Sequence, residues 1–135
     1  MENQKSAIGL DSNLAAAIGY PIGLIALILI FIEKDNKFVR FHAIQSIIWS
    51  LLCSIVWTIT FILGFVFVFG GAVAGAASGV SALSFLGLFG YLFFLIATVV
   101  GIGWFAAIVL AAVKSYGGNK IMLPIAGKFA EKWSA

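Results

Sequence analysis

The stretch that decides the fold is residues 41–113, which read FHAIQSIIWSLLCSIVWTITFILGFVFVFGGAVAGAASGVSALSFLGLFGYLFFLIATVVGIGWFAAIVLAAV. It contains no Asp, Glu, Lys or Arg, and its single imidazole is His42. Soluble domains carry about 25% charged residues, whereas the whole chain has 10%, with 63% hydrophobic residues. A water-exposed surface cannot be built from this stretch. The sequence therefore predicts an all-α, polytopic helical membrane protein.

Three segments are long and apolar enough to be predicted as transmembrane helices within a single domain, 1–135. They are residues 14–32, 43–69 and 85–113, and a helix needs about 20 residues to cross the hydrocarbon. The first contains Pro21, which lipid-embedded helices tolerate. Residues 70–84 are rich in Gly, Ala and Ser, and we expect them to form a connector. Gly117 and Gly118 follow the third segment and are expected to stop its helix.

The placement of basic residues favours three spans over four. With three spans, seven of the eight basic residues lie on one side of the membrane and only Lys5 lies on the other. With four spans the division is five to three. Basic residues concentrate on the cytoplasmic side, so we expect an N-terminus outside and a cytoplasmic C-terminus.

The tail is predicted to form a short interfacial helix over residues 124–133. Ile125, Phe129 and Trp133 recur every four residues, and the charged residues of this segment fall on other faces. Such a helix lies in the plane of the membrane interface, with its lysines toward water.

Polar side chains collect on one face of the second predicted helix when residues are placed about 100° apart. In lipid, such groups favour a partner helix or water over acyl chains. One interpretation is an interfacial anchor, in which Arg40 reaches phosphate and the next polar residues bind headgroups or loop carbonyls. The other is a polar vestibule or partner-binding face made by Arg40, His42, Gln45, Ser46, Ser50 and Ser54.

Small residues recur every four positions in several segments, a spacing that lets helix backbones approach closely. Packing within one subunit and self-association both explain this pattern. The candidate packing residues are Gly19, Gly23, Gly71, Gly75 and Gly79.

Groups needed for catalysis or metal binding are missing from the apolar part of the sequence. No carboxylate occurs between Asp35 and Glu131, and His42 has no second His, Asp or Glu one turn away. We therefore expect no enzymatic activity, no cofactor and no metal site. The net charge of +3 comes without a basic run, so we expect the partners to be the lipid bilayer and other membrane proteins or further copies, and not nucleic acid.

Two motifs resemble those of a known family: EKDNKFVRFHAIQS at 33–46 and YGGNKIMLPIAG at 116–127. The family consists of small prokaryotic membrane proteins, mostly of unknown function, related to the twenty-kilodalton subunit of the translocon at the chloroplast inner envelope. The resemblance implies membrane association and oligomeric pore formation. The plant member is usually described with four membrane helices, from which our three-span prediction departs. The sequence shows no plastid transit peptide, which favours a prokaryotic plasma membrane.

Two functional hypotheses follow. In the first, the chain is a non-enzymatic subunit or scaffold of a membrane assembly. In the second, it is an oligomeric channel or protein-translocation component, whose path would be lined by Ser46, Ser50, Ser54 and Thr58.

Overall fold

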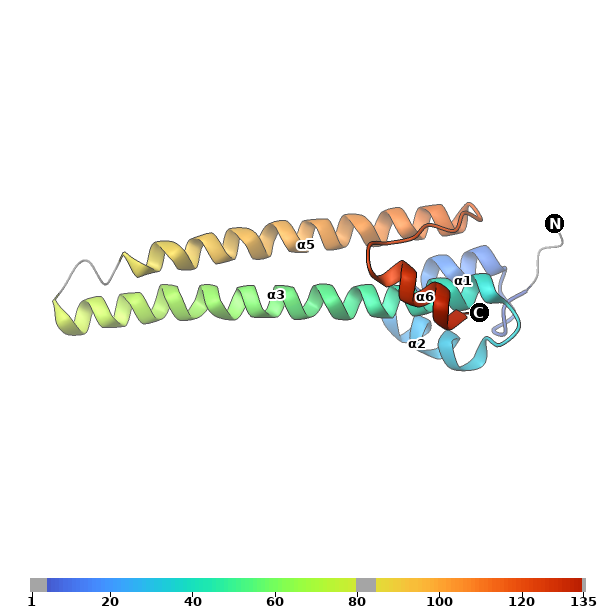
Figure 1. The fold of residues 1–135 in the computed structure, drawn as a ribbon, viewed down its shortest axis with the longest axis horizontal. Helices are drawn as coiled ribbons and strands as arrows, with labels where there is room; N and C mark the ends of the chain where they lie inside the picture. The colour runs from blue at the N-terminus through green and yellow to red at the C-terminus, as the bar shows by residue number, and fades with distance from the viewer. Residues whose placement is uncertain (1–4, 80–84, 135) are drawn as a thin grey trace. The chain divides into compact units, whose positions relative to one another are not determined.

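The computed structural model describes residues 5–79 and 85–134, and these residues form helices joined by short connections (Figure 1). The prediction of an all-α fold is confirmed. The chain divides into two compact units, each described here by itself: unit 1 joins Met1–Leu52 to Trp104–Ala135, and unit 2 is Cys53–Gly103. The helices are α1 (Ser12–Ile18), α2 (Gly23–Ile32), α3 (Lys37–Ser78), α5 (Leu86–Tyr116) and α6 (Ala126–Ser134).

Helices α3 and α5 are long and apolar enough to cross a membrane, and within the described residues they are the two that meet this test. α3 has 42 residues and α5 has 31. At about 1.5 Å per residue, both exceed the roughly 30 Å of a hydrocarbon core. Only part of each helix therefore fits within the bilayer. The predicted span 43–69 lies inside α3, and α5 covers all of 85–113 except its first residue.

The prediction of a connector over 70–84 is wrong for its first half, because α3 continues to Ser78. Alanine favours helix, and the glycines in this part let a neighbouring helix approach. The helix ends at Gly79, whose φ of +64° is a left-handed conformation that suits glycine. Residues 80–84 lie outside the described residues.

The prediction of one continuous helix over 14–32 is also wrong, because the structure has α1 and α2 with a break between them. Pro21 has no N–H to donate to the carbonyl of Ala17. That carbonyl instead accepts from the N–H of Tyr20 at 3.3 Å. With 7 and 10 residues, neither helix has the length needed to cross a bilayer alone.

Side-chain caps begin α1 and α3, and a glycine ends α5. The Asp11 carboxylate accepts from the N–H two residues later at 2.9 Å and begins α1. The Asn36 side-chain oxygen accepts from the N–H three residues later at 3.2 Å and begins α3. At the end of α5, Gly118 has φ +75° and donates to the Ser115 carbonyl at 2.9 Å. The predicted stop at Gly117–Gly118 is confirmed.

Within unit 2, α3 and α5 pack through small residues. On α5, Gly87, Gly90 and Ala97 are buried, at a spacing of three and then seven residues that is typical of helix pairs. A Cβ atom built on Gly90 would lie 2.5 Å from Val68 Cγ2 and 2.7 Å from the Gly64 carbonyl oxygen. The two backbones therefore approach too closely there for any side chain.

Unit 1 gathers α1, α2 and α6 around the first turns of α3 (Figure 1). Phe41 and Ile44 of α3 pack against Ala130 of α6 and Ile30 of α2. A second cluster joins segments distant in sequence: Tyr20, Ala111, Leu123 and Ala126. These contacts bring the α1–α2 turn and the tail to the same stretch of α3.

Candidate functional site

A buried polar cluster lies in unit 1 and consists of Tyr20, His42, Gln45 and Ser46, all at most 2% exposed. Gln45 is its centre. The Gln45 side-chain nitrogen donates to the Tyr20 hydroxyl at 2.6 Å and to the Ile121 carbonyl at 3.0 Å. The Gln45 side-chain oxygen accepts from the N–H of Leu123 at 3.0 Å. One side-chain amide thus bonds three groups: the Tyr20 hydroxyl, the Ile121 carbonyl and the Leu123 N–H.

The direction of the next hydrogen bond follows from the first. The oxygen of the Tyr20 hydroxyl accepts from Gln45, so the hydroxyl proton needs an acceptor of its own. His42 Nδ1 lies 2.8 Å away and takes that role. The proton of the neutral imidazole then sits on Nε2, which has no hydrogen-bond partner among the described residues. Instead, the rings of Tyr20, Phe38 and Phe41 surround this imidazole, with centroid distances of 4.6 to 5.7 Å.

The fourth member of the cluster ties α3 to the α1–α2 turn. The Ser46 hydroxyl donates to the Gly19 carbonyl at 2.8 Å. Gly19 itself lies in ordinary contact with α2, since a Cβ atom there would be 3.6 Å from Ala26 Cβ. The cluster therefore holds the break between α1 and α2 on one side and the tail on the other.

The cluster joins the two sequence motifs, 33–46 and 116–127. A Cβ atom on Gly127 would lie 3.0 Å from the Gln45 side-chain oxygen and 2.9 Å from Met122 Cβ, so only glycine fits without a shift. Ile125 has φ +63°, a conformation that is unusual and strained for a β-branched residue. The tail backbone is thus bent to meet the Gln45 amide.

The structure places the residues predicted for a polar vestibule or partner-binding face at different positions. His42, Gln45 and Ser46 come together, but they bond within the chain and are buried. The Gln45 bond to the Ile121 carbonyl matches the other interpretation, an anchor to a loop carbonyl. Arg40 and Ser50 are half-buried on α3, and Ser54 belongs to unit 2.

The predicted packing glycines separate into different roles. Gly71 and Gly75 are buried within unit 2, and Gly79 is exposed at the end of α3. A Cβ atom built on Gly23 would meet no other atom within 4 Å, so this glycine marks no close contact inside unit 1. A very close approach lies at Gly90, which we did not predict, although the spacing of small residues on α5 could have indicated it.

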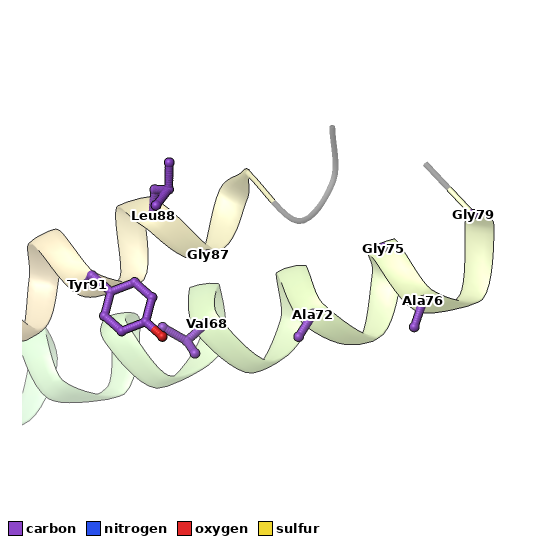
Figure 2. Close-up of a pocket in the computed structure, with 8 residues that line it drawn as sticks. All are labelled: Val68, Ala72, Gly75, Ala76, Gly79, Gly87, Leu88 and Tyr91. Carbon is purple, nitrogen blue, oxygen red and sulfur yellow. The ribbon is translucent and has the colours of Figure 1, made fainter. Parts of the chain in front are cut away.

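An apolar cleft of about 650 Å³ opens between α3 and α5 inside unit 2 (Figure 2). Its polar side-chain group is the Tyr91 phenol, so its lining offers little to orient a polar ligand. The residues that line it are Val68, Ala72, Gly75, Ala76, Gly79, Gly87, Leu88 and Tyr91.

The tail helix exposes its apolar face. Ile125, Phe129 and Trp133 are 61%, 48% and 56% exposed, and Lys128 and Lys132 lie beside them. α6 itself begins at Ala126, one residue after Ile125, because the left-handed backbone of Ile125 interrupts the helix. This arrangement fits the predicted interfacial helix.

Replacing Tyr20 by phenylalanine is expected to destabilise unit 1 while keeping its ring packing. His42 Nδ1 loses its donor and Gln45 loses one acceptor, at about 1–3 kcal/mol for each buried group left unpaired. Thermal unfolding in mild detergent measures the loss. The double variant with Gln45→Leu should lose much less stability than the sum of the two single losses, because both variants break the same Tyr20–Gln45 bond. Fully additive losses would contradict the network.

Metal ligands are not grouped in the described part of the chain: no three His, Cys, Asp or Glu side chains come together to hold an ion there.

Comparison with known proteins gives the family. The model of the magnetosome magnetite crystal formation protein family matches residues 4–130. The UPF0132 membrane protein MJ1443 of Methanocaldococcus jannaschii is 33% identical over 131 residues, which cover 96% of this chain and 94% of that protein. MJ1527 of the same organism, also named a UPF0132 membrane protein, is 26% identical over 128 residues, covering 94% of this chain and 73% of that protein.

No solved structure matches the chain. The names of the relatives confirm the prediction of a small prokaryotic membrane protein family, and the resemblance to the chloroplast translocon stays a prediction. The chain belongs to the magnetosome magnetite crystal formation protein family.

Proposed function

We propose that the protein is a non-enzymatic subunit or scaffold of an assembly in the prokaryotic plasma membrane. In this proposal α3 and α5 cross the bilayer and the tail lies on the cytoplasmic side. Its partners are lipid and membrane proteins, including further copies of itself, and no nucleic acid.

The observation that carries the proposal is that the polar cluster is used internally. A pore lined by the polar face of α3 needs hydroxyl and amide groups that face a shared path. Ser46 instead donates to the Gly19 carbonyl, and Gln45 holds the backbone of the tail. These groups hold the segments of unit 1 together, which supports a structural role over a pore.

The outward faces of α3 and α5 supply the surface for association. Large apolar side chains cover them, and in lipid such faces pack against acyl chains or other helices. Examples that are more than half exposed are Ile59, Val66, Val73, Leu95, Ile102 and Phe105.

The family description refers to magnetite crystal formation. Direct contact with iron would use carboxylate or other metal-binding side chains in a group, and the described residues hold no such group of three. We therefore propose that this chain contributes by organising the membrane or its proteins, not by coordinating the mineral.

Purified protein in liposomes is expected to pass no solute, while its mass in mild detergent shows self-association or a bound membrane partner. Flux measurements with solutes of graded size, together with light scattering, check this. Size-selective flux that disappears in Ser50→Leu or Ser54→Leu would favour the channel hypothesis instead. A monomer without any partner after extraction would contradict the scaffold.

A further inference from the structure

We infer that α1 and α2 form a re-entrant hairpin that enters and leaves the bilayer on one side, so that the chain crosses the membrane twice and both termini are cytoplasmic. This inference depends on the membrane placement of α3 and α5 and not on the scaffold role. It replaces the orientation predicted from the sequence, which required residues 14–32 to cross the bilayer.

The first observation is that the two flanks of this segment are hydrogen-bonded to each other. The N–H of Ala7 donates to a Glu33 carboxylate oxygen at 2.7 Å, and the Asn36 side-chain amide donates to the Ser12 hydroxyl at 2.5 Å. Glu33, Asn36 and Ser12 are buried, at 3%, 7% and 7% exposure. A helix that crosses the hydrocarbon separates its ends by about 30 Å. Flanks in direct contact must lie on the same side.

The second observation concerns the depth that the hairpin can reach. α2 has 10 residues, which span about 15 Å, or about half of a roughly 30 Å hydrocarbon core. The break before α2 is held by the bond from Ser46 to the Gly19 carbonyl. The segment therefore turns back at a depth that matches one leaflet.

The third observation is an apolar face on α2 that unit 1 leaves uncovered. Leu24 and Phe31 are 68% and 72% exposed, and Leu27 and Ile28 are also exposed. Lys34 and Lys37 follow directly and are exposed as well. Acyl chains suit the apolar face, and anionic headgroups suit the lysines at its end. The apolar face of α2 is therefore covered by lipid of the cytoplasmic leaflet.

The distribution of charge agrees with this topology. Four basic residues precede the apolar stretch and four follow it: Lys5, Lys34, Lys37, Arg40, Lys114, Lys120, Lys128 and Lys132. With two crossings, all eight lie on one side, whereas three crossings leave Lys5 alone on the other. The positive-inside rule favours the larger asymmetry and places that side in the cytoplasm.

Cysteine labelling of cells tests the inference through the two flanks of the hairpin. Cys53→Ser removes the native thiol, and single cysteines are then introduced as Ala7→Cys, Asp35→Cys and Phe85→Cys. All three side chains are exposed, and Ala7→Cys keeps the backbone N–H that bonds Glu33. Lys34→Cys is a second choice for the later flank. Each variant is first shown to stay in the membrane after a carbonate wash.

A membrane-impermeant maleimide on intact cells is expected to label Phe85→Cys strongly. Ala7→Cys and Asp35→Cys should gain label at least tenfold when the membrane is permeabilised. Labelling of Ala7→Cys in intact cells while Asp35→Cys stays protected would show a third crossing and overturn the inference. Strong labelling of Ala7→Cys and Asp35→Cys on intact cells, with Phe85→Cys labelled only after permeabilisation, would overturn the cytoplasmic assignment.

A second measurement tests the contact with lipid. A nitroxide attached through Leu27→Cys in liposomes is expected to relax faster with oxygen, which partitions into lipid, than with a water-soluble nickel complex. Faster relaxation with nickel would place α2 in water and overturn the re-entrant hairpin, whatever the liposome flux and mass measurements show.

Discussion

Replacing Gly90 by alanine is expected to lower the free energy of unfolding by about 1–3 kcal/mol, and replacing it by valine should cost more. The added methyl would meet Val68 Cγ2 at 2.5 Å, and the Val68 nitrogen and the Gly64 carbonyl oxygen at 2.7 Å. Two of these atoms are backbone and cannot rotate away, so α3 and α5 must separate along unit 2. Unfolding in mild detergent, followed by circular dichroism, measures the change.

Two other glycines of α5 serve as matched controls. Gly103→Ala has no atom within 4 Å of the new methyl, and Gly87→Ala meets only the Val68 carbonyl oxygen at 4.0 Å. Both should leave stability unchanged or slightly raised, since alanine favours helix. Adding Val68→Ala to Gly90→Ala should restore only part of the loss, because the backbone contacts remain. Equal losses at Gly87 and Gly90 would show that the close approach is not there.

Replacing Gln45 by leucine is expected to release the tail from α3. The variant leaves the Ile121 carbonyl and the Leu123 N–H without partners and removes a donor to Tyr20. Each buried group left unpaired costs about 1–3 kcal/mol, so the total loss is among the largest that one side chain in unit 1 can cause. Trypsin should then cut at Lys128 much faster than in the unaltered protein, because that lysine lies on the released segment.

The Ser50→Ala variant is the matched control, since Ser50 is a half-buried polar residue on the same helix. It should leave both the cleavage rate and the unfolding midpoint near their original values. Gln45→Glu separates shape from hydrogen bonding: it keeps an acceptor for Leu123 but loses both donors. An intact tail in Gln45→Leu would mean that apolar contacts alone hold α6.

The long helices follow from sequence because their signals are local. The uncharged stretch and the stop at Gly117–Gly118 each act within a few residues of where they appear. Pro21 could be read from the sequence too, but proline occurs both inside spanning helices and at helix breaks. The bonds of Ser12 to Asn36 and of Gly19 to Ser46 stabilise the broken arrangement over a continuous helix. These are tertiary contacts that periodicity does not contain.

The candidate site was likewise predicted only as far as local sequence determines it. Placing α3 on a wheel grouped His42, Gln45 and Ser46 on one face, and the structure does bring them together. A wheel cannot tell whether the partner of a polar face is water, another subunit or the chain itself. Tyr20 was missed because it lies on another segment, and nothing in its local sequence links it to Gln45.

The contact between Gln45 and the tail has a consequence for biosynthesis. Gln45 leaves the ribosome 76 residues before Ile121 and 78 residues before Leu123. Most of α3 and all of α5 are made in that interval, so the amide has no lasting partner while these helices are being delivered to the bilayer. The contacts of Gln45 with the tail therefore form only after α5 has been made. A nascent chain arrested before Ile121 would expose an incomplete unit 1 to chaperones and proteases.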